Sequence, residues 1–242
     1  MQIPKTIHYI WLGGEKPDNV RNTIKSWNKR APKFEIKEWS ERDLNILYQN
    51  NDFYKQALDD GNYSYASDVA RLYILKRYGG IYMDTDEILL KSPEGIIRNR
   101  ELVLGLQEPA KEFMITAFIA AIPEQNNIVA MLDKYQLLSY NRENLIPNSE
   151  FFGPLLFEKF HLKKTNVTQT RCNGKIIFYE PNVLYQTSFH STAIHIGMKS
   201  WGSKTRHDKF RIEARKHIHN RCEAGIFRIF NDVARKLIPD NN

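Results

Sequence analysis

Cysteine is scarce in this chain, and long apolar runs are missing. Only Cys172 and Cys222 occur among the 242 residues, with no CxxC spacing, so neither a disulfide framework nor a structural zinc site is expected. The longest apolar run, from Ile115 to Ile122, is interrupted by Thr116 and is far shorter than the roughly 20 residues that cross a bilayer. The N-terminus lacks the pattern of a signal peptide. We therefore expect a cytoplasmic protein.

The remaining composition is typical of a globular domain with an uneven charge. Hydrophobic residues make up 42% and charged residues 26% of the chain, which is ordinary for a packed core. The net charge is +7, and residues 199–242 hold eleven Lys and Arg against five Asp and Glu. A basic segment of this kind can bind nucleic acid, lie on an anionic membrane or simply be solvated. No nucleic-acid-binding motif accompanies it, so no nucleic-acid partner is expected.

Strand and helix patterns alternate along most of the chain. Short apolar or period-two segments predict strands at residues 7–12, 34–39, 81–83, 102–106, 115–122, 175–179 and 193–196. Helical spacing predicts helices at residues 18–29, 64–78, 127–138 and 148–160. Within the last of these, Gly153-Pro154 is expected to open the helix. The alternation favours an α/β fold with a mostly parallel sheet.

Two carboxylates follow one of the predicted strands. Asp84 and Asp86 come directly after Ile81-Tyr82-Met83, and ligands of open α/β sheets gather at the carboxyl ends of strands. Their oxygens can hold Mg²⁺ or Mn²⁺ while a phosphate takes the remaining positions. A divalent cation there would neutralise a departing nucleoside diphosphate. A DxD sequence alone is also common in surface turns, so the neighbouring residues must distinguish a metal site from a turn.

The preceding helix carries a second charged pair. Asp68 and Arg71 are three residues apart and share one helix face. Gly79 and Gly80 then permit a tight reversal immediately before the strand. A surface ion pair is the simpler interpretation of Asp68 and Arg71, but it does not require the small residues beside them or the GGxYxDxD sequence that follows.

Residues 65–86, YASDVARL through YGGIYMDTD, resemble the sugar-binding DXD region of glycosyltransferase family 32. Similar blocks occur in yeast Golgi mannosyltransferases, in bacterial capsule and lipopolysaccharide sugar transferases, and in the glucosylating domain of large clostridial toxins. The N-terminal segment IPKTIHYIWLGG, residues 3–14, is similar to the opening of these enzymes. Together the two blocks cover about the first 95 residues in the expected order.

The resemblance implies a GT-A fold, with a Rossmann-like nucleotide-sugar-binding domain, and assigns roles to residues of this chain. The catalytic residues would be Asp68, Arg71, Asp86 and Lys199. The donor would be bound by Ile10, Trp11, Gly13, Asp68, Arg71, Asp84, Gly153, Lys199 and Trp201. Mn²⁺, or Mg²⁺, would be held by Asp84, Asp86 and His195. Trp11 can equally be a core residue, and His195 a satisfied structural histidine.

The sequence thus predicts a metal-dependent hexosyltransferase that retains the anomeric configuration and acts in surface polysaccharide, capsule or lipopolysaccharide synthesis. A UDP-linked hexose is favoured over GDP-mannose as donor, with a glycan or lipid-linked acceptor. A binding module without turnover and a DxD phosphatase are the alternatives. Residues 1–207 would form the catalytic domain, and residues 208–242 a basic amphipathic helical tail. That tail would pack on the domain or lie on an anionic membrane at the inner face of the cell membrane.

Overall fold

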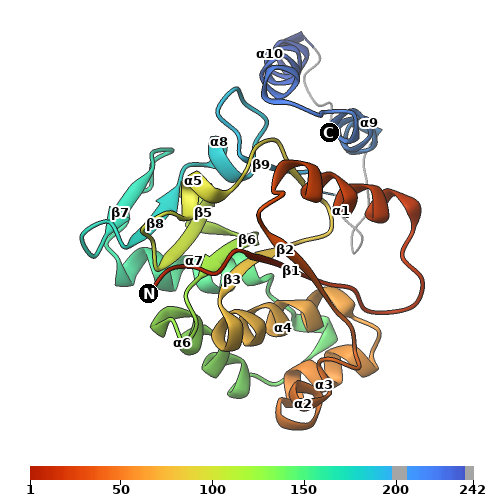
Figure 1. Ribbon diagram of the computed structural model, residues 1–242, viewed down its shortest axis with the longest axis vertical. Helices are drawn as coiled ribbons and strands as arrows, with labels where there is room; N and C mark the ends of the chain where they lie inside the picture. The colour runs from red at the N-terminus through yellow and green to blue at the C-terminus, as the bar shows by residue number, and fades with distance from the viewer. Residues whose placement is uncertain (198–205, 238–242) are drawn as a thin grey trace.

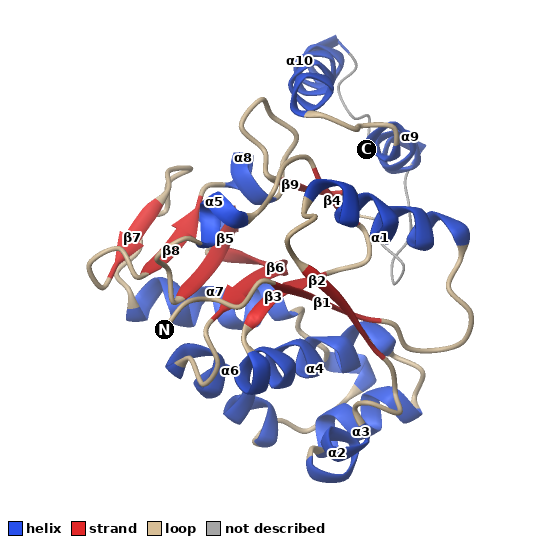
Figure 2. Ribbon diagram, viewed as in Figure 1, coloured by secondary structure: helices blue, strands red, loops and turns tan. Residues whose placement is uncertain are grey.

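A seven-stranded sheet crosses the centre of the computed structural model, which describes residues 1–197 and 206–237. Helices cover both faces of this sheet, as Figure 1 shows by chain order and Figure 2 by element type. Two further helices, α9 and α10, lie at one end of the molecule (Figure 1). This arrangement is the α/β architecture that the alternating sequence pattern predicts.

The elements follow the predicted order closely. The strands are β1 (Thr6–Ile10), β2 (Glu35–Trp39), β3 (Gly80–Met83), β4 (Glu87–Leu89), β5 (Leu102–Glu108), β6 (Phe113–Ala121), β7 (Gln169–Arg171), β8 (Ile176–Tyr179) and β9 (Ala193–His195). The α-helices are α1 (Asp18–Arg30), α2 (Asn45–Asn50), α3 (Asp52–Asp59), α4 (Tyr63–Tyr78), α5 (Glu94–Ile97), α6 (Asn126–Gln136), α7 (Asn148–Lys159), α8 (Pro181–Leu184), α9 (Arg206–Lys216) and α10 (Arg221–Leu237). Two short 3₁₀ helices span Pro109–Lys111 and Arg142–Asn144.

The central sheet has the strand order β2-β1-β3-β6-β5-β8-β7. Strands β2, β1, β3, β5 and β8 run in one direction, whereas β6 and β7 run against their neighbours. Five of the seven strands are therefore co-directional, and the mostly parallel sheet expected from the sequence is confirmed. The carboxyl ends of β1 and β3, which pair in parallel, meet at the same edge of the sheet.

Each face of the sheet has its own apolar core. On one face α3, α4, α6 and α7 contribute buried residues such as Leu72, Met131 and Phe152. On the other face the core includes Trp27 of α1 and Leu184 of α8. Two covered faces explain why the central strands read as nearly continuous apolar runs rather than as alternating patterns.

Helix α4 is enclosed on nearly all sides and ends where the sequence predicts. It has little difference in polarity between its faces, and even Asp68 and Arg71 are buried in it. Such a helix is surrounded by protein rather than lying at the surface. Gly79 closes it with φ of +63°, and Gly80 follows at +92°, conformations that glycine adopts without strain. The chain thereby turns directly from α4 into β3.

A small two-stranded sheet, β4 paired antiparallel with β9, lies beside the central sheet. Its apolar residues Ile88 and Ile194 form a third cluster with Ile218 and Ala224 of the C-terminal segment. The backbone oxygen of His219 also accepts a hydrogen bond from Arg30 Nη2 at 2.5 Å. The C-terminal helices α9 and α10 therefore pack on the first 197 residues.

One local prediction differs from the structure. Helix α1 begins at Asp18 as expected, with Pro17 as its N-cap. Helix α7 begins at Asn148, so Gly153-Pro154 lies inside it rather than at its start; Pro147 ahead of Asn148 supplies the extended N-cap. Among the described residues, no helix combines the length and the apolar character that crossing a membrane requires.

Candidate functional site

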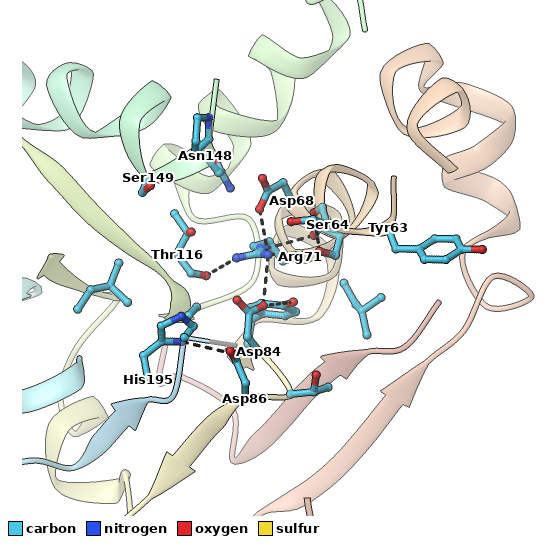
Figure 3. A pocket seen from close by; sticks show the side chains of 18 of the residues that line it. Tyr63, Ser64, Asp68, Arg71, Asp84, Asp86, Thr116, Asn148, Ser149 and His195 are labelled. Atoms are coloured by element: carbon cyan, nitrogen blue, oxygen red, sulfur yellow. Dashed lines mark hydrogen bonds and ion pairs between the residues drawn. The ribbon is translucent and has the colours of Figure 1, made fainter. Parts of the chain in front are cut away.

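A pocket of about 570 Å³ opens at the carboxyl ends of β1 and β3. Segments far apart in the sequence line it: the end of β1, the start and middle of α4, the loop after β3, strand β6, the start of α7, and the region of β9 and α9 (Figure 3). Its polar lining includes Asp68, Arg71, Asp84, Asp86, Asn148 and His195. The volume is in the range of small-molecule sites.

Arg71 forms the centre of the polar network in this pocket. Its Nη2 lies 2.9 Å from Asp68 Oδ1 and 3.2 Å from Asp84 Oδ1, and both are ion pairs. Its Nη1 donates to the backbone oxygen of Thr116 at 2.6 Å, and its Nε to that of Ser67 at 3.2 Å. Arg71 is only 3% exposed. The guanidinium is therefore held rigidly by α4, β3 and β6, as Figure 3 shows.

Burial changes the ionisation of the groups around Arg71. Burial raises the pKa of Asp68 to about 6, although the positive charge of Arg71 opposes this rise. Burial also raises the pKa of the Tyr82 hydroxyl well above its usual value. This neutral hydroxyl donates to Asp84 Oδ1 at 2.7 Å, and the Tyr82 ring lies 4.6 Å from the guanidinium of Arg71.

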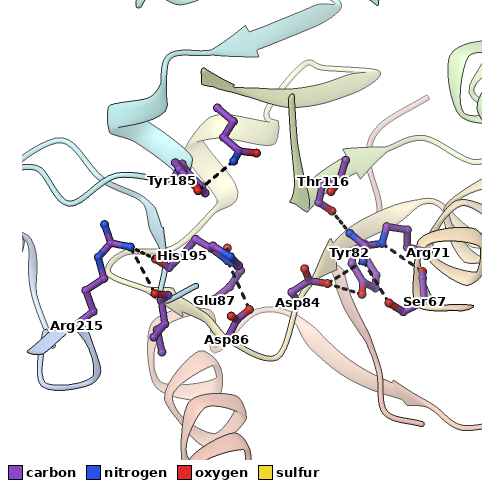
Figure 4. Close-up of polar contacts among 12 residues, drawn as sticks. Ser67, Arg71, Tyr82, Asp84, Asp86, Glu87, Thr116, Tyr185, His195 and Arg215 are labelled. Carbon is purple, nitrogen blue, oxygen red and sulfur yellow. Dashed lines mark hydrogen bonds and ion pairs between the residues drawn. The ribbon is translucent and has the colours of Figure 1, made fainter. Parts of the chain in front are cut away.

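The two aspartates of the DxD sequence point to different partners. Asp84 is directed toward Arg71 and Tyr82 through its Oδ1 atom, whereas Asp86 lies on the side of His195 (Figures 3 and 4). Asp86 Oδ1 is 3.5 Å from His195 Nδ1. Both aspartates line the pocket, so the predicted pair does face a common cleft.

His195 is oriented by a buried carboxylate. In the β4–β9 pair, Glu87 is directly opposite His195, and its Oε1 lies 2.7 Å from His195 Nδ1 (Figure 4). The Glu87 side chain is fully buried, and burial raises its pKa to about 7. Burial would lower the pKa of His195, but Asp86 and Glu87 outweigh it and raise that pKa to about 9. The pair thus favours an imidazolium beside carboxylates.

Asp86 and His195, once the imidazolium has lost a proton, together form a donor set that suits a divalent cation. A carboxylate oxygen and an imidazole nitrogen are ligands that Mn²⁺ accepts and that Mg²⁺ accepts less readily. Glu87 bonds one ring nitrogen, which is how carboxylates orient metal-binding histidines. Within residues 1–197 and 206–237, no group of three or more His, Cys, Asp or Glu side chains surrounds a common point. A cation here would therefore need phosphate oxygens or water as further ligands.

Asn148 brings an amide into the same pocket, beside Asp68. It is the first residue of α7 and is 2% exposed. Its side-chain and backbone N–H groups act on the Asp68 carboxylate and oppose the rise in the pKa of Asp68. Figure 3 shows its side chain near Asp68, with Ser149 beside it. Its Oδ1 has no hydrogen-bond partner among the described residues and can accept a hydrogen bond from a bound ligand.

The other predicted site residues have diverse positions. Ile10 and Trp11 line the pocket, and Trp11 Nε1 donates to the backbone oxygen of Gly14 at 3.0 Å. Gly13 has φ of +78° and packs against the Tyr63 ring. Gly153 lies under the backbone oxygen of Glu112. Gly13 and Gly153, both described, do not line the pocket. Lys199 and Trp201 lie outside the described residues.

Three groups in or beside the pocket were not predicted from the sequence. Glu87 could have been noticed, because a carboxylate directly after DxD begins the apolar run Ile88-Leu89-Leu90. The ring of Tyr185 stacks on His195 at a centroid distance of 5.5 Å, and no sequence pattern indicates this contact. The approach of the Asn148 amide to Asp68 is also visible only in the folded chain.

Comparison with known proteins finds similarity in the part of the chain that contains the DxD residues. Residues 17–103 match the family described as "glycosyltransferase sugar-binding region containing DXD motif". Inositol phosphoceramide mannosyltransferase 1 of Schizosaccharomyces pombe is 26% identical over 113 residues, which are 45% of this chain and 35% of that protein. Subversion of eukaryotic traffic protein A of Legionella pneumophila is 32% identical over 117 residues, 38% of this chain and 18% of that protein. The chain thus matches about a third or less of these relatives' length.

A solved structure supports the fold. The PaToxG glycosyltransferase superposes with a TM-score of 0.52 at 20% identity, covering 66% of this chain and 71% of that chain. This likeness, together with the sheet order, confirms the GT-A fold that the sequence resemblance implies. The matched family region contains α4, the reversal at Gly79 and the DxD residues. Over these residues the chain is similar to the glycosyltransferases with a DXD-containing sugar-binding region, the family 32 type that its motifs resemble.

Proposed function

We propose that this chain transfers a hexose from a nucleotide-sugar donor to a glycan or lipid-linked acceptor. The observation that carries the proposal is the convergence, around one pocket of about 570 Å³, of Arg71 with Asp68 and Asp84, and of Asp86 with His195. The first group presents a fixed guanidinium beside carboxylates that can accept hydrogen bonds from sugar hydroxyls. The second presents a carboxylate oxygen and an imidazole nitrogen 3.5 Å apart, which are atoms that can bind a divalent cation.

The donor sugar is assigned to the Arg71 side of the pocket. Asp68 can accept hydrogen bonds from sugar hydroxyls there, and the side-chain oxygen of Asn148 offers a further acceptor in a buried setting. Trp11 at the pocket wall supports stacking on the donor base, worth roughly 1 kcal/mol beyond its buried area. Gly13 and Gly153 remain predictions, and neither of these two described residues lines the pocket. Lys199 and Trp201, which lie outside the described residues, also remain predictions.

The metal is assigned to Asp86 and His195, with Mn²⁺ favoured over Mg²⁺ by the imidazole ligand. When bound, the cation would neutralise charge on the donor diphosphate. Glu87 would hold the His195 ring in place through the 2.7 Å contact with Nδ1, and the other ring nitrogen would serve the cation. Asp84 would contact the donor ribose or the metal. Its carboxylate is held in place for this, because Tyr82 and Arg71 both bind its Oδ1.

Transfer with retention is proposed to occur on the front face of the sugar. Arg71 is too constrained to move, so it would stabilise charge as the sugar–phosphate bond breaks rather than transfer a proton. Asp68 is paired with Arg71 on the pocket wall, which favours a positioning role over nucleophilic attack. The departing phosphate oxygen would then take the proton of the acceptor hydroxyl. The anomer of the product, read by NMR, tests this, since an inverted product excludes it.

The donor is proposed to be a UDP-hexose, with GDP-mannose as the second candidate because the fission-yeast relative is named as a mannosyltransferase. That relative's name also includes inositol phosphoceramide, which supports testing lipid-linked acceptors. A role in surface polysaccharide, capsule or lipopolysaccharide synthesis at the cytoplasmic side belongs to the same proposal.

The decisive experiment measures hydrolysis and transfer with a panel of UDP- and GDP-sugars, with Mn²⁺, with Mg²⁺ and with a chelator. Turnover of one donor that requires the cation and falls at least 100-fold in Asp86→Asn supports the proposal. Asp133→Asn, an exposed change on α6, is the matched control and should leave turnover unchanged. Donor binding without turnover would favour the binding module, and release of phosphate from simple phosphomonoesters would favour the phosphatase.

Membrane association is a separate part of the proposal. On α10, Ile226, Ile229 and Phe230 are 49%, 55% and 70% exposed and lie at helical spacings that place them on one face. Such a face can enter the headgroup region of an anionic membrane. Flotation with anionic liposomes should fall when Ile229 and Phe230 are changed to Ser. Equal flotation of the variant and the original chain would exclude this surface.

A further inference from the structure

Helix α9 reaches the same pocket from the C-terminal part of the chain. Arg211, Ile212 and Arg215 all line the pocket together with Asp86 and His195. Arg215 Nη1 donates to the backbone oxygen of His195 at 2.8 Å, which ties α9 to the end of β9 (Figure 4). Ile212 packs on the apolar cluster of β4 and β9. Helix α9 is therefore fixed against the strand that carries His195.

Arg211 lies one helical turn before Arg215, on the same face of α9. Arg211 lines the pocket together with Tyr185, and the Tyr185 ring stacks on His195. With Arg215 of the same helix bonded to His195, Arg211 belongs to the α9 and β9 side of the pocket.

The charges on that side leave Arg211 available to a ligand. Asp68 and Asp84 are engaged by Arg71, and Glu87 and Asp86 lie against His195. None of the carboxylates whose side chains the structure describes forms an ion pair with Arg211. A partly buried guanidinium in a pocket, with no counterion among the described side chains, is suited to planar, doubly hydrogen-bonded recognition of phosphate.

We propose that Arg211 binds the diphosphate of the nucleotide donor and that α9 is thereby part of the donor site. This inference rests on the proposed function, because it takes the pocket to be the donor site. It extends that site beyond the family region at residues 17–103 to a helix more than 100 residues later. It also gives the C-terminal segment a role in binding that is separate from any membrane contact.

The experiment compares a nucleoside diphosphate with the nucleoside that lacks phosphate. Isothermal titration with Mn²⁺ present would measure the Kd of UDP and uridine, or of GDP and guanosine if the chain prefers that base. Arg211→Gln should weaken diphosphate binding about tenfold or more, as expected for loss of a charge-assisted hydrogen bond, and leave nucleoside binding unchanged. Arg211→Lys, which keeps the charge, should recover part of the affinity.

Lys209→Gln is the matched control, because Lys209 is an exposed cation on the same helix and does not line the pocket. Its diphosphate Kd should equal that of the original chain. If Arg211→Gln behaves like this control, or if it weakens the nucleoside as much as the diphosphate, the inference is wrong. The inference is also wrong if Arg211→Gln changes only the KM of the acceptor. If the unaltered chain binds neither diphosphate, the proposed function fails instead.

Discussion

Replacing Arg71 by Met should destabilise the fold in a manner that depends on pH. The substitution leaves Asp68 and Asp84 without the cation that lies 2.9 Å and 3.2 Å from their oxygens. Removing one partner of a buried ion pair costs about 3–5 kcal/mol, because the remaining charge stays buried. The backbone oxygen of Thr116 also loses its donor. We therefore expect a loss of about 3–5 kcal/mol at pH 8.

The pH dependence follows from Asp68. Its pKa is about 6 in the folded chain even with Arg71 present, against about 3.9 in an unfolded chain. A carboxyl whose folded pKa is raised contributes stability that is present at low pH and is lost as pH rises through the folded pKa. Without Arg71 the pKa of Asp68 rises further, and each pKa unit of that rise corresponds to about 1.4 kcal/mol of stability lost at high pH. At pH 5, where the carboxyl is already protonated in the folded state, the loss should be clearly smaller.

Urea unfolding followed by circular dichroism at pH 5 and pH 8 measures both values. Arg77→Met is the control, because Arg77 is an exposed arginine on the same helix that bonds Tyr73 at 3.1 Å. It should change stability by no more than about 0.5 kcal/mol at either pH. A loss for Arg71→Met that is equal at the two pH values, or below about 1 kcal/mol at pH 8, would refute the reasoning.

Three further outcomes are expected. Gly153→Ala should lower the free energy of unfolding, measured by thermal unfolding, by about 1–2 kcal/mol, because the new Cβ would lie 1.9 Å from the Glu112 backbone oxygen and this overpacking outweighs the gain in helix propensity. Its control is Gly95→Ala, which has open space around the new Cβ and should not lower the stability. Burial lowers the pKa of His8 to about 4, so stability should fall by about 3 kcal/mol as pH drops from 6.5 to 4, and His8→Gln should remove that part of the pH slope. Glu87→Gln should weaken Mn²⁺ binding about 10- to 100-fold in titrations with bound diphosphate. An unchanged Mn²⁺ affinity would show that Glu87 does not support the metal site.

The fold was predictable wherever a local pattern was strong. The helix over residues 64–78, the glycine reversal after it and the strand before Asp84 follow from spacing alone, and the structure has them as α4, Gly79 and β3. What the spacing could not reveal is that α4 is buried on nearly all sides. The surface ion pair considered for Asp68 and Arg71 is therefore wrong, and the pair is an interior one.

The partners of these residues could not be predicted, because they come from distant and very short elements. Strands β4 and β9 have three residues each, too few for a periodic signal. Their pairing nevertheless sets Glu87 against His195, 108 positions apart. Arg71 likewise bonds a backbone oxygen of β6. A backbone contact does not depend on the type of side chain at position 116, so no sequence pattern indicates it.

The folded environment gives the two aspartates of the motif unequal tasks. Asp84 is bound by Arg71 and Tyr82 through one oxygen, so it belongs to the rigid network that also fixes Asp68. Asp86 lies instead against His195, whose ring is held by Glu87. Loss of Asp84 should consequently disturb Arg71 before it disturbs a cation, whereas loss of Asp86 removes a candidate metal ligand directly. One short sequence motif thus supplies two different groups to the pocket, and the difference between them comes from elements that the motif does not contain.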